Sequence, residues 1–130
     1  MIVRKVLNIE DLPSKHVAVR RALERCSVPY IDHAKTAVEA LDMIEAAIKE
    51  GKPYHVIVSD MYFPISPGGM EAQAGMYVIE ELQARGIDVP VIVCSSARMV
   101  IPEIVGCIHY SPRNDLDADM REMVDIVRNM

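Results

Sequence analysis

The stretch "HVIVSDMYFP", residues 55 to 64, places a charge directly after a short apolar run. Val56, Ile57 and Val58 are β-branched, and an unbroken run of this kind is typical of a strand that is buried on both faces of a parallel sheet. Asp60 follows at the carboxyl end of this strand. In open α/β folds functional groups collect beyond the carboxyl ends of the strands, so Asp60 is a candidate functional residue.

Strands and helices are predicted to alternate along the whole chain. The expected strands cover residues 3–9, 29–34, 56–59, 89–95 and 106–111, and the expected helices cover residues 13–26, 36–51 and 76–86, a short segment at 99–105 and the chain from 117 onward. Such alternation predicts βαβ units and a parallel sheet. We therefore expect a single doubly wound α/β domain over residues 1–130. Among the orders of this class we expect the flavodoxin-like one, a five-stranded sheet in the order 2-1-3-4-5, which alternation alone does not decide.

Composition limits the classes of function. The chain has 130 residues, 51% of them hydrophobic, and a net charge of −5, which indicates one globular domain and argues against direct binding of nucleic acid. No apolar run is long enough to cross a membrane and no leader opens the chain, so we expect a soluble, cytoplasmic protein without a membrane partner. Three cysteines and four histidines are scattered, which argues against a site with His and Cys ligands.

Acidic residues follow two of the predicted strands. Glu10 and Asp11 end the first strand as Asp60 ends the third, and Ser95 ends the fourth. If the first and third strands are neighbours, three carboxylates converge, and each pair at about 5 Å repels by about 3 kcal/mol at an effective dielectric near 20. Protonation of one carboxylate or binding of a hard cation would relieve this repulsion, and oxygen ligands suit Mg²⁺. The alternative is structural, because acidic residues after strands also serve as helix N-caps, as Asp11 could.

Four segments together resemble the receiver domain of response regulators of the chemotaxis-regulator type. "VLNIEDLPS" (6–14) resembles the first strand and acidic pair of that family, "AKTAVEALDMI" (34–44) its second helix, "VIVSDMYFP" (56–64) the phosphoacceptor segment and "VPVIVCSSA" (89–97) the fourth strand with its hydroxyl residue. The resemblance extends over essentially the whole chain. Relative to the family, the fourth helix is expected to be shortened.

The resemblance assigns roles to individual residues. It implies that Asp60 is the phosphoacceptor and that Mg²⁺ is held by Glu10, Asp11, Asp60 and the backbone carbonyl of Tyr62. Ser95 would be the switch hydroxyl. A histidine kinase or histidine phosphotransfer protein would donate the phosphoryl group, and an output protein of unknown identity would read the change.

The segment "CIHYSPRND" (107–115) departs from the family pattern, in which a lysine precedes a proline after the fifth strand. Alignment on the proline puts Ser111 at the lysine position and Ile108 at the position of the switch aromatic, so that both are lost. In a second register Tyr110 and Arg113 have the family's spacing of aromatic and lysine, and Arg113 could supply the cation. Arg98 is a further candidate.

Three functions remain open. The first is a stand-alone receiver in a two-component or phosphorelay pathway, which is a signalling domain and not an enzyme. The second is a pseudo-receiver, an interaction module that does not depend on phosphorylation. The third is a small Mg²⁺-dependent phosphohydrolase, which would need a general acid near Asp60 that the "DMY" segment does not offer. The loop at 64–75 is longer than usual and is either a lid or partner-specific element, or a tolerated insertion.

Overall fold

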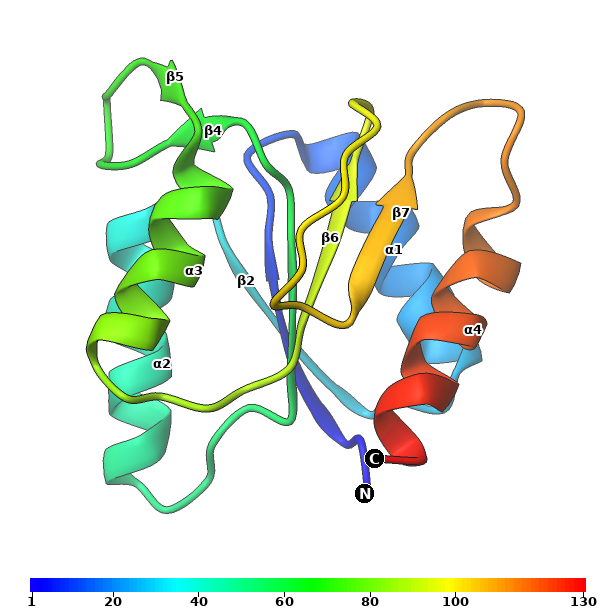
Figure 1. Ribbon diagram of the computed structural model, residues 1–130, viewed down its shortest axis with the longest axis horizontal. Coiled ribbons are helices and arrows are strands. Elements are labelled where there is room, and N and C mark those ends of the chain that lie inside the picture. The colour runs from blue at the N-terminus through cyan, green and yellow to red at the C-terminus, as the bar shows by residue number, and fades with distance from the viewer.

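The computed structural model describes all residues from 1 to 130, and its centre is one parallel sheet (Figure 1). The strands are β1 (Lys5–Ile9), β2 (Tyr30–Ala34), β3 (Val56–Ser59), β6 (Val91–Ser95) and β7 (Gly106–His109), and the helices are α1 (Pro13–Arg25), α2 (Ala37–Lys49), α3 (Ala74–Ala84) and α4 (Leu116–Arg128). The sheet order is β2-β1-β3-β6-β7 with every pair parallel. This confirms the predicted flavodoxin-like order.

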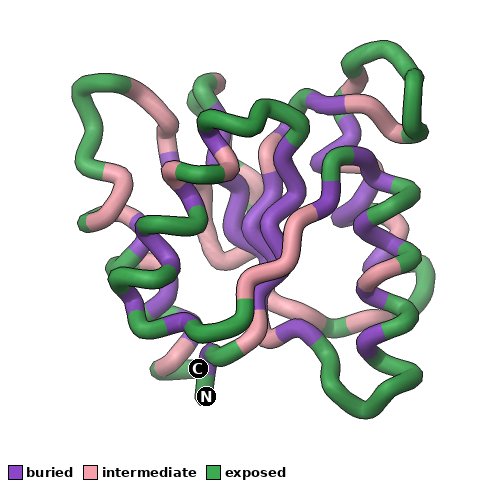
Figure 2. Tube along the Cα trace, turned by 180° about the vertical axis from the view of Figure 1, so that it is seen from behind, coloured by how far each residue is buried: buried purple, intermediate pink, exposed green.

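Two helices cover each face of the sheet. Figure 1 shows α2 and α3 on one side and α1 and α4 on the other. Alternate residues of β3 belong to separate cores, because Ile57 packs toward α2 and α3 whereas Val56 and Val58 pack toward α1 and α4. Both faces of β3 are therefore buried, as the apolar run predicts, and Figure 2 shows the buried strands at the centre.

The predicted short helix at 99–105 is wrong. The structure has no helix between β6 and β7, and residues 96–105 form bends, turns and irregular chain. The connection of residues 96–105 must return along a five-residue strand of about 16 Å, and a seven-residue helix would cover about 10 Å of this and leave three residues for both turns and the remaining distance. Pro102 also lacks the N–H that a helix interior needs. The shortened fourth helix that we expected is therefore absent, and no helix connects β6 to β7.

The loop at 64–75 contains a small hairpin that the sequence did not predict. Strands β4 (Phe63–Pro64) and β5 (Glu71–Ala72) pair in antiparallel fashion. Phe63 is fully buried, and the carbonyl of Ile65 accepts a hydrogen bond from the N–H of Val38 at 2.9 Å, which ties the loop to the start of α2. None of the helices is both long and apolar enough to cross a membrane.

Candidate functional site

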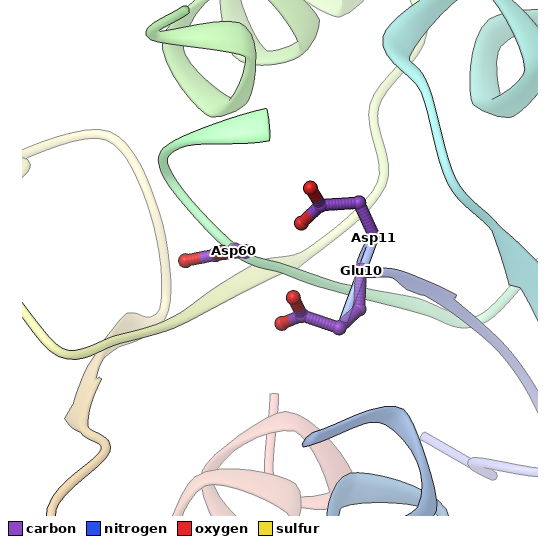
Figure 3. Close-up of side chains that lie close together, drawn as sticks. All are labelled: Glu10, Asp11 and Asp60. Carbon is purple, nitrogen blue, oxygen red and sulfur yellow. The ribbon is translucent and has the colours of Figure 1, made fainter. Parts of the chain in front are cut away.

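Three carboxylates meet at the carboxyl ends of β1 and β3. Ile9 lies opposite Ser59 in the parallel register, and the N–H of Asp60 donates to the carbonyl of Ile9 at 3.0 Å. This register brings the residues that follow each strand together. One carboxylate oxygen from each of Glu10, Asp11 and Asp60 lies within 4.8 Å of the others (Figure 3). The predicted convergence of these three side chains is confirmed.

The three acidic residues differ in exposure. The side chain of Glu10 is 2% exposed and that of Asp60 is 14% exposed, whereas Asp11 lies at the surface. Burial raises the pKa of Glu10 to about 7, with the neighbouring Asp60 adding to the shift and Lys15 opposing it. Asp11 does not cap α1, since the N-cap residue is Leu12 and its N–H is accepted by Glu10 Oε2 at 3.2 Å.

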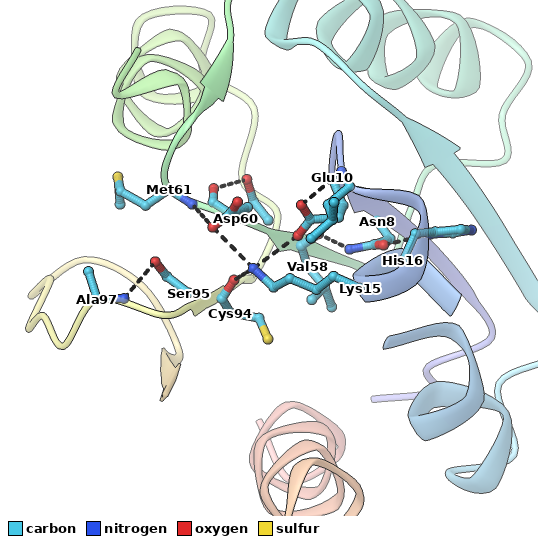
Figure 4. Close-up of polar contacts among 12 residues, drawn as sticks. Asn8, Glu10, Lys15, His16, Val58, Asp60, Met61, Cys94, Ser95 and Ala97 are labelled. Carbon is cyan, nitrogen blue, oxygen red and sulfur yellow. Dashed lines mark hydrogen bonds and ion pairs between the residues drawn. The ribbon is translucent and has the colours of Figure 1, made fainter. Parts of the chain in front are cut away.

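Lys15 enters this cluster from the first turn of α1. Its Nζ lies 3.0 Å from Glu10 Oε1, 3.2 Å from Asp60 Oδ1 and 2.8 Å from the carbonyl oxygen of Cys94 (Figure 4). Its side chain is only 6% exposed, and the ring centroid of Tyr110 lies 5.1 Å from Nζ. Burial favours the neutral amine, but the charges of Glu10 and Asp60 outweigh it and raise the pKa of Lys15.

Lys15 is absent from the site predicted from the sequence, although the sequence contains a signal for it. Val19 and Ala22 of α1 form an apolar stripe with Cys26 at its C-cap, and Lys15 precedes Val19 by four residues on the same face. A lysine on the buried face of a helix must find a counter-charge. Lys15 lies in the first helical turn after the acidic end of β1, so its nearest counter-charge is the acidic cluster.

Asp60 is held at one carboxylate oxygen and open at the other. Oδ1 accepts a hydrogen bond from the N–H of Met61 at 2.7 Å and contacts Lys15, while no protein donor reaches Oδ2. The start of α3 lies directly against this segment, because the N–H of Gly75 donates to the carbonyl of Met61 at 2.9 Å. The start of α3 thereby holds the backbone of Asp60 and Met61, the segment that we call the Asp60 loop.

The structure does not bring every predicted site residue to the cluster. Tyr62 lines the same pocket as the carboxylates, together with Glu71 of the β4–β5 hairpin. Ser95 is buried at the end of β6, where its Oγ accepts a hydrogen bond from the N–H of Ala97 at 3.2 Å, and it is Ser96 that lines the pocket.

The two predicted arginines lie apart from the pocket. Arg113 is exposed and is not among the residues that line the acidic pocket, and its N–H donates to Ser111 Oγ at 3.3 Å. Arg98 lines other pockets, beside Cys107 and His109. Ile108, at the proline-anchored aromatic position, is a buried core residue.

Two histidines form a second polar layer behind Glu10. The rings of His16 and His33 are stacked with centroids 3.6 Å apart and planes 4° from parallel. His33 Nε2 donates to the carbonyl of Glu10 at 2.6 Å, and His16 Nδ1 donates to Asn8 Oδ1 at 2.7 Å. Burial and the adjacent His33 lower the pKa of His16 to about 4, so the ring of His16 is uncharged near neutral pH.

Comparison with known proteins supports the fold. No protein-family model and no curated protein sequence matches the chain. Among solved structures, a sensor protein from Polaromonas sp. JS666 superposes with a TM-score of 0.72 at 18% identity, covering 97% of each chain. The response regulator TrrA from Thermotoga maritima, in complex with Mg²⁺ and BeF, has a TM-score of 0.70 at 17% identity and covers 96% of this chain and 99% of its own. The chemotaxis response regulator CheY4 of Vibrio cholerae has a TM-score of 0.68 at 18% identity and covers 97% of this chain and 99% of its own.

Proposed function

We propose that this protein is a response-regulator receiver that accepts a phosphoryl group on Asp60 and passes the change to a partner protein. The observation that carries the proposal is the open Oδ2 of Asp60 in a pocket that Glu10 and Asp11 also line. The similarity of the fold to that of receiver domains, one of them in complex with Mg²⁺ and BeF, supports it. The donor would be a histidine kinase or a histidine phosphotransfer protein.

The acidic residues fit a hard divalent cation. Glu10, Asp11 and Asp60 offer carboxylate oxygens within 4.8 Å of one another, and oxygen ligands of this kind suit Mg²⁺. Tyr62, which lines the same pocket, would add its backbone carbonyl. When bound, Mg²⁺ neutralises negative charge on the phosphoryl oxygens during transfer.

The chain's own groups prepare Asp60 for the transfer. The Met61 N–H and Lys15 hold Oδ1, so Oδ2 is the oxygen that can attack phosphorus. A bond forms between Oδ2 and phosphorus as the bond from phosphorus to the donor's nitrogen or oxygen breaks. The electron pair of the broken bond stays on the leaving group, which takes its proton from solvent. The product is an acyl phosphate on Asp60.

One observation favours a second candidate, an interaction module that does not depend on phosphorylation. Lys15 already supplies the cluster with a buried positive charge, and neither Arg98 nor Arg113 lines the pocket. Such a site could be stable without a metal or a phosphoryl group. Partner binding by this module would then be the same for wild type and Asp60→Asn.

Intact-mass measurement tests the proposal. Wild type and Asp60→Asn are incubated with Mg²⁺ and acetyl phosphate, and the mass is followed over time. We expect a single phosphoryl adduct on the wild type and none on the variant. If Mg²⁺ binds to the wild type but no adduct forms, the receiver proposal fails and the interaction module becomes the better explanation. Continuous release of phosphate from small esters would instead identify a phosphohydrolase.

A further inference from the structure

We propose that Lys15 is the cation that binds the phosphoryl group on Asp60, and that it reaches the site from α1. The proposal rests on the proposed function of Asp60. It starts from the position of Nζ, which contacts the Asp60 carboxylate and the Glu10 carboxylate at once. No basic residue other than Lys15 lines the acidic pocket.

The ammonium group is fully engaged in the present structure. A lysine has three N–H donors, and three acceptors surround Nζ: Glu10 Oε1 at 3.0 Å, Asp60 Oδ1 at 3.2 Å and the Cys94 carbonyl at 2.8 Å. The aromatic face of Tyr110 lies near the same group. Lys15 is therefore held in one place, with its charge directed at the carboxylate that would be modified.

A purely structural role does not account well for this arrangement. A buried ion pair is weak evidence for stability, because a hydrophobic residue of similar volume is often as stabilising. The neighbours of Lys15 along its stripe, Val19 and Ala22, are apolar and belong to the core between α1 and the sheet. A methionine at position 15 would continue that stripe. The ammonium serves the acidic pocket, which lies at the end of the stripe.

Phosphorylation would change the partners of Lys15. The acyl phosphate replaces one carboxylate charge with a phosphoryl group that carries about two negative charges near neutral pH. Its oxygens lie two bonds beyond Oδ2 of Asp60, within reach of a side chain that already contacts Oδ1 at 3.2 Å. We expect Nζ to leave Glu10 for a phosphoryl oxygen, which forms the stronger charge-assisted hydrogen bond. Lys15 keeps its proton throughout and takes part by binding alone.

The decisive variants are Lys15→Met, which removes the charge, and Lys15→Arg, which retains it. Lys49→Met is the matched control, because Lys49 is an exposed residue in the last turn of α2. The rate of adduct formation with acetyl phosphate and Mg²⁺ is followed by intact mass. We expect Lys15→Met to lower the rate by about 10- to 100-fold, the effect of losing a hydrogen bond to a charged group. Lys15→Arg should restore part of the rate, and Lys49→Met should match the wild type.

Binding measurements separate a role toward the phosphoryl group from a general structural role. Mg²⁺ alone and Mg²⁺ with beryllofluoride, a mimic of the phosphoryl group, are titrated while the amide resonances of Asp60 and Met61 are recorded by NMR. Lys15→Met should bind Mg²⁺ at least as tightly as the wild type, because a repelling charge is removed. It should bind beryllofluoride about 10-fold more weakly or worse. Equal loss of both ligands would show disruption of the site and would overturn the proposal.

The outcomes distinguish this inference from the proposed function. If the wild type forms no adduct and binds no beryllofluoride, the receiver function itself fails and the inference fails with it. If the wild type is phosphorylated and Lys15→Met is phosphorylated equally fast, only the role of Lys15 is refuted. A slow Arg113→Met beside an unaffected Lys15→Met would assign the cation to Arg113. If Lys15→Met does not fold, the same criteria apply to Lys15→Gln.

Discussion

Replacement of Gly75 by alanine should disturb the site from the side of α3. A Cβ at position 75 would lie 2.5 Å from the carbonyl oxygen of Asp60 and 2.9 Å from Cα of Met61. Both atoms belong to the backbone, so no flexible side chain can give way. Restoring ordinary contact of about 3.5 Å requires a shift of about 1 Å between α3 and the Asp60 loop.

The size of the effect follows from two opposing contributions. Overpacking costs about 1–3 kcal/mol, and the change from glycine to alanine in a helix returns about 0.5–1 kcal/mol. We expect Gly75→Ala to lower the free energy of unfolding by about 1–2 kcal/mol, measured by urea denaturation. A displacement of about 1 Å at a reacting group can cost about 100-fold in rate, so phosphorylation should suffer more than stability.

Gly106→Ala is the matched control for this prediction. A Cβ at Gly106 would meet only the end of the Met123 side chain, with Sδ at 2.8 Å and Cε at 2.9 Å. Methionine adapts readily, so the free energy of unfolding should change by less than about 1 kcal/mol. If Gly75→Ala is as stable as Gly106→Ala and is phosphorylated at the wild-type rate, the contact between Gly75 and the Asp60 loop does not fix the site.

Three further predictions concern stability. His16 has a pKa of about 4 in the fold and 6.5 when unfolded, so stability is full above pH 6.5 and falls as the pH decreases toward 4. For this partly exposed ring we expect the free energy of unfolding to fall by about 1–3 kcal/mol as the pH decreases from 6.5 to 4. Urea denaturation should show a smaller decrease in His16→Asn than in the wild type, and an equal decrease would refute the prediction. Phe63→Ala should cost about 3–5 kcal/mol, because Phe63 is fully buried, and a loss below about 1 kcal/mol would mean that the loop does not depend on it. Thr36→Ala should cost about 1 kcal/mol, because Thr36 Oγ1 accepts the N–H of Glu39 at 3.2 Å, and an unchanged urea midpoint would contradict this.

The strands could be predicted from the sequence because each strand carried an independent signal, whereas their order came from the flavodoxin-like class of fold. The run Val56–Val58 is apolar on both faces, and this pattern is produced by a central parallel strand. The connection at 96–105 had no such signal. Its apolar residues allowed a helix although Pro102 argued against one, and the sequence does not contain the path that the connection must follow from β6 back to β7.

The acidic cluster was predictable for a similar reason, whereas its cation was not. Glu10, Asp11 and Asp60 follow strands directly, so the sheet register alone brings them together. Lys15 reaches the cluster from a helix, and its direction depends on how α1 packs on the sheet. The family pattern places a cation near the fifth strand and made Arg113 the candidate, but Arg113 is exposed and does not line the pocket.

The structure adds a third way to relieve repulsion among the carboxylates. The sequence suggested a proton or a bound cation, and the chain itself provides an ammonium group between Glu10 and Asp60. When all three carboxylates are ionised, one ammonium leaves two negative charges, which match a single divalent cation. Lys15 contacts Glu10 and Asp60 from the buried side, whereas Asp11 lies at the surface. A lysine on α1 is thus compatible with a metal bound from the solvent side, so the two cations need not compete for one position.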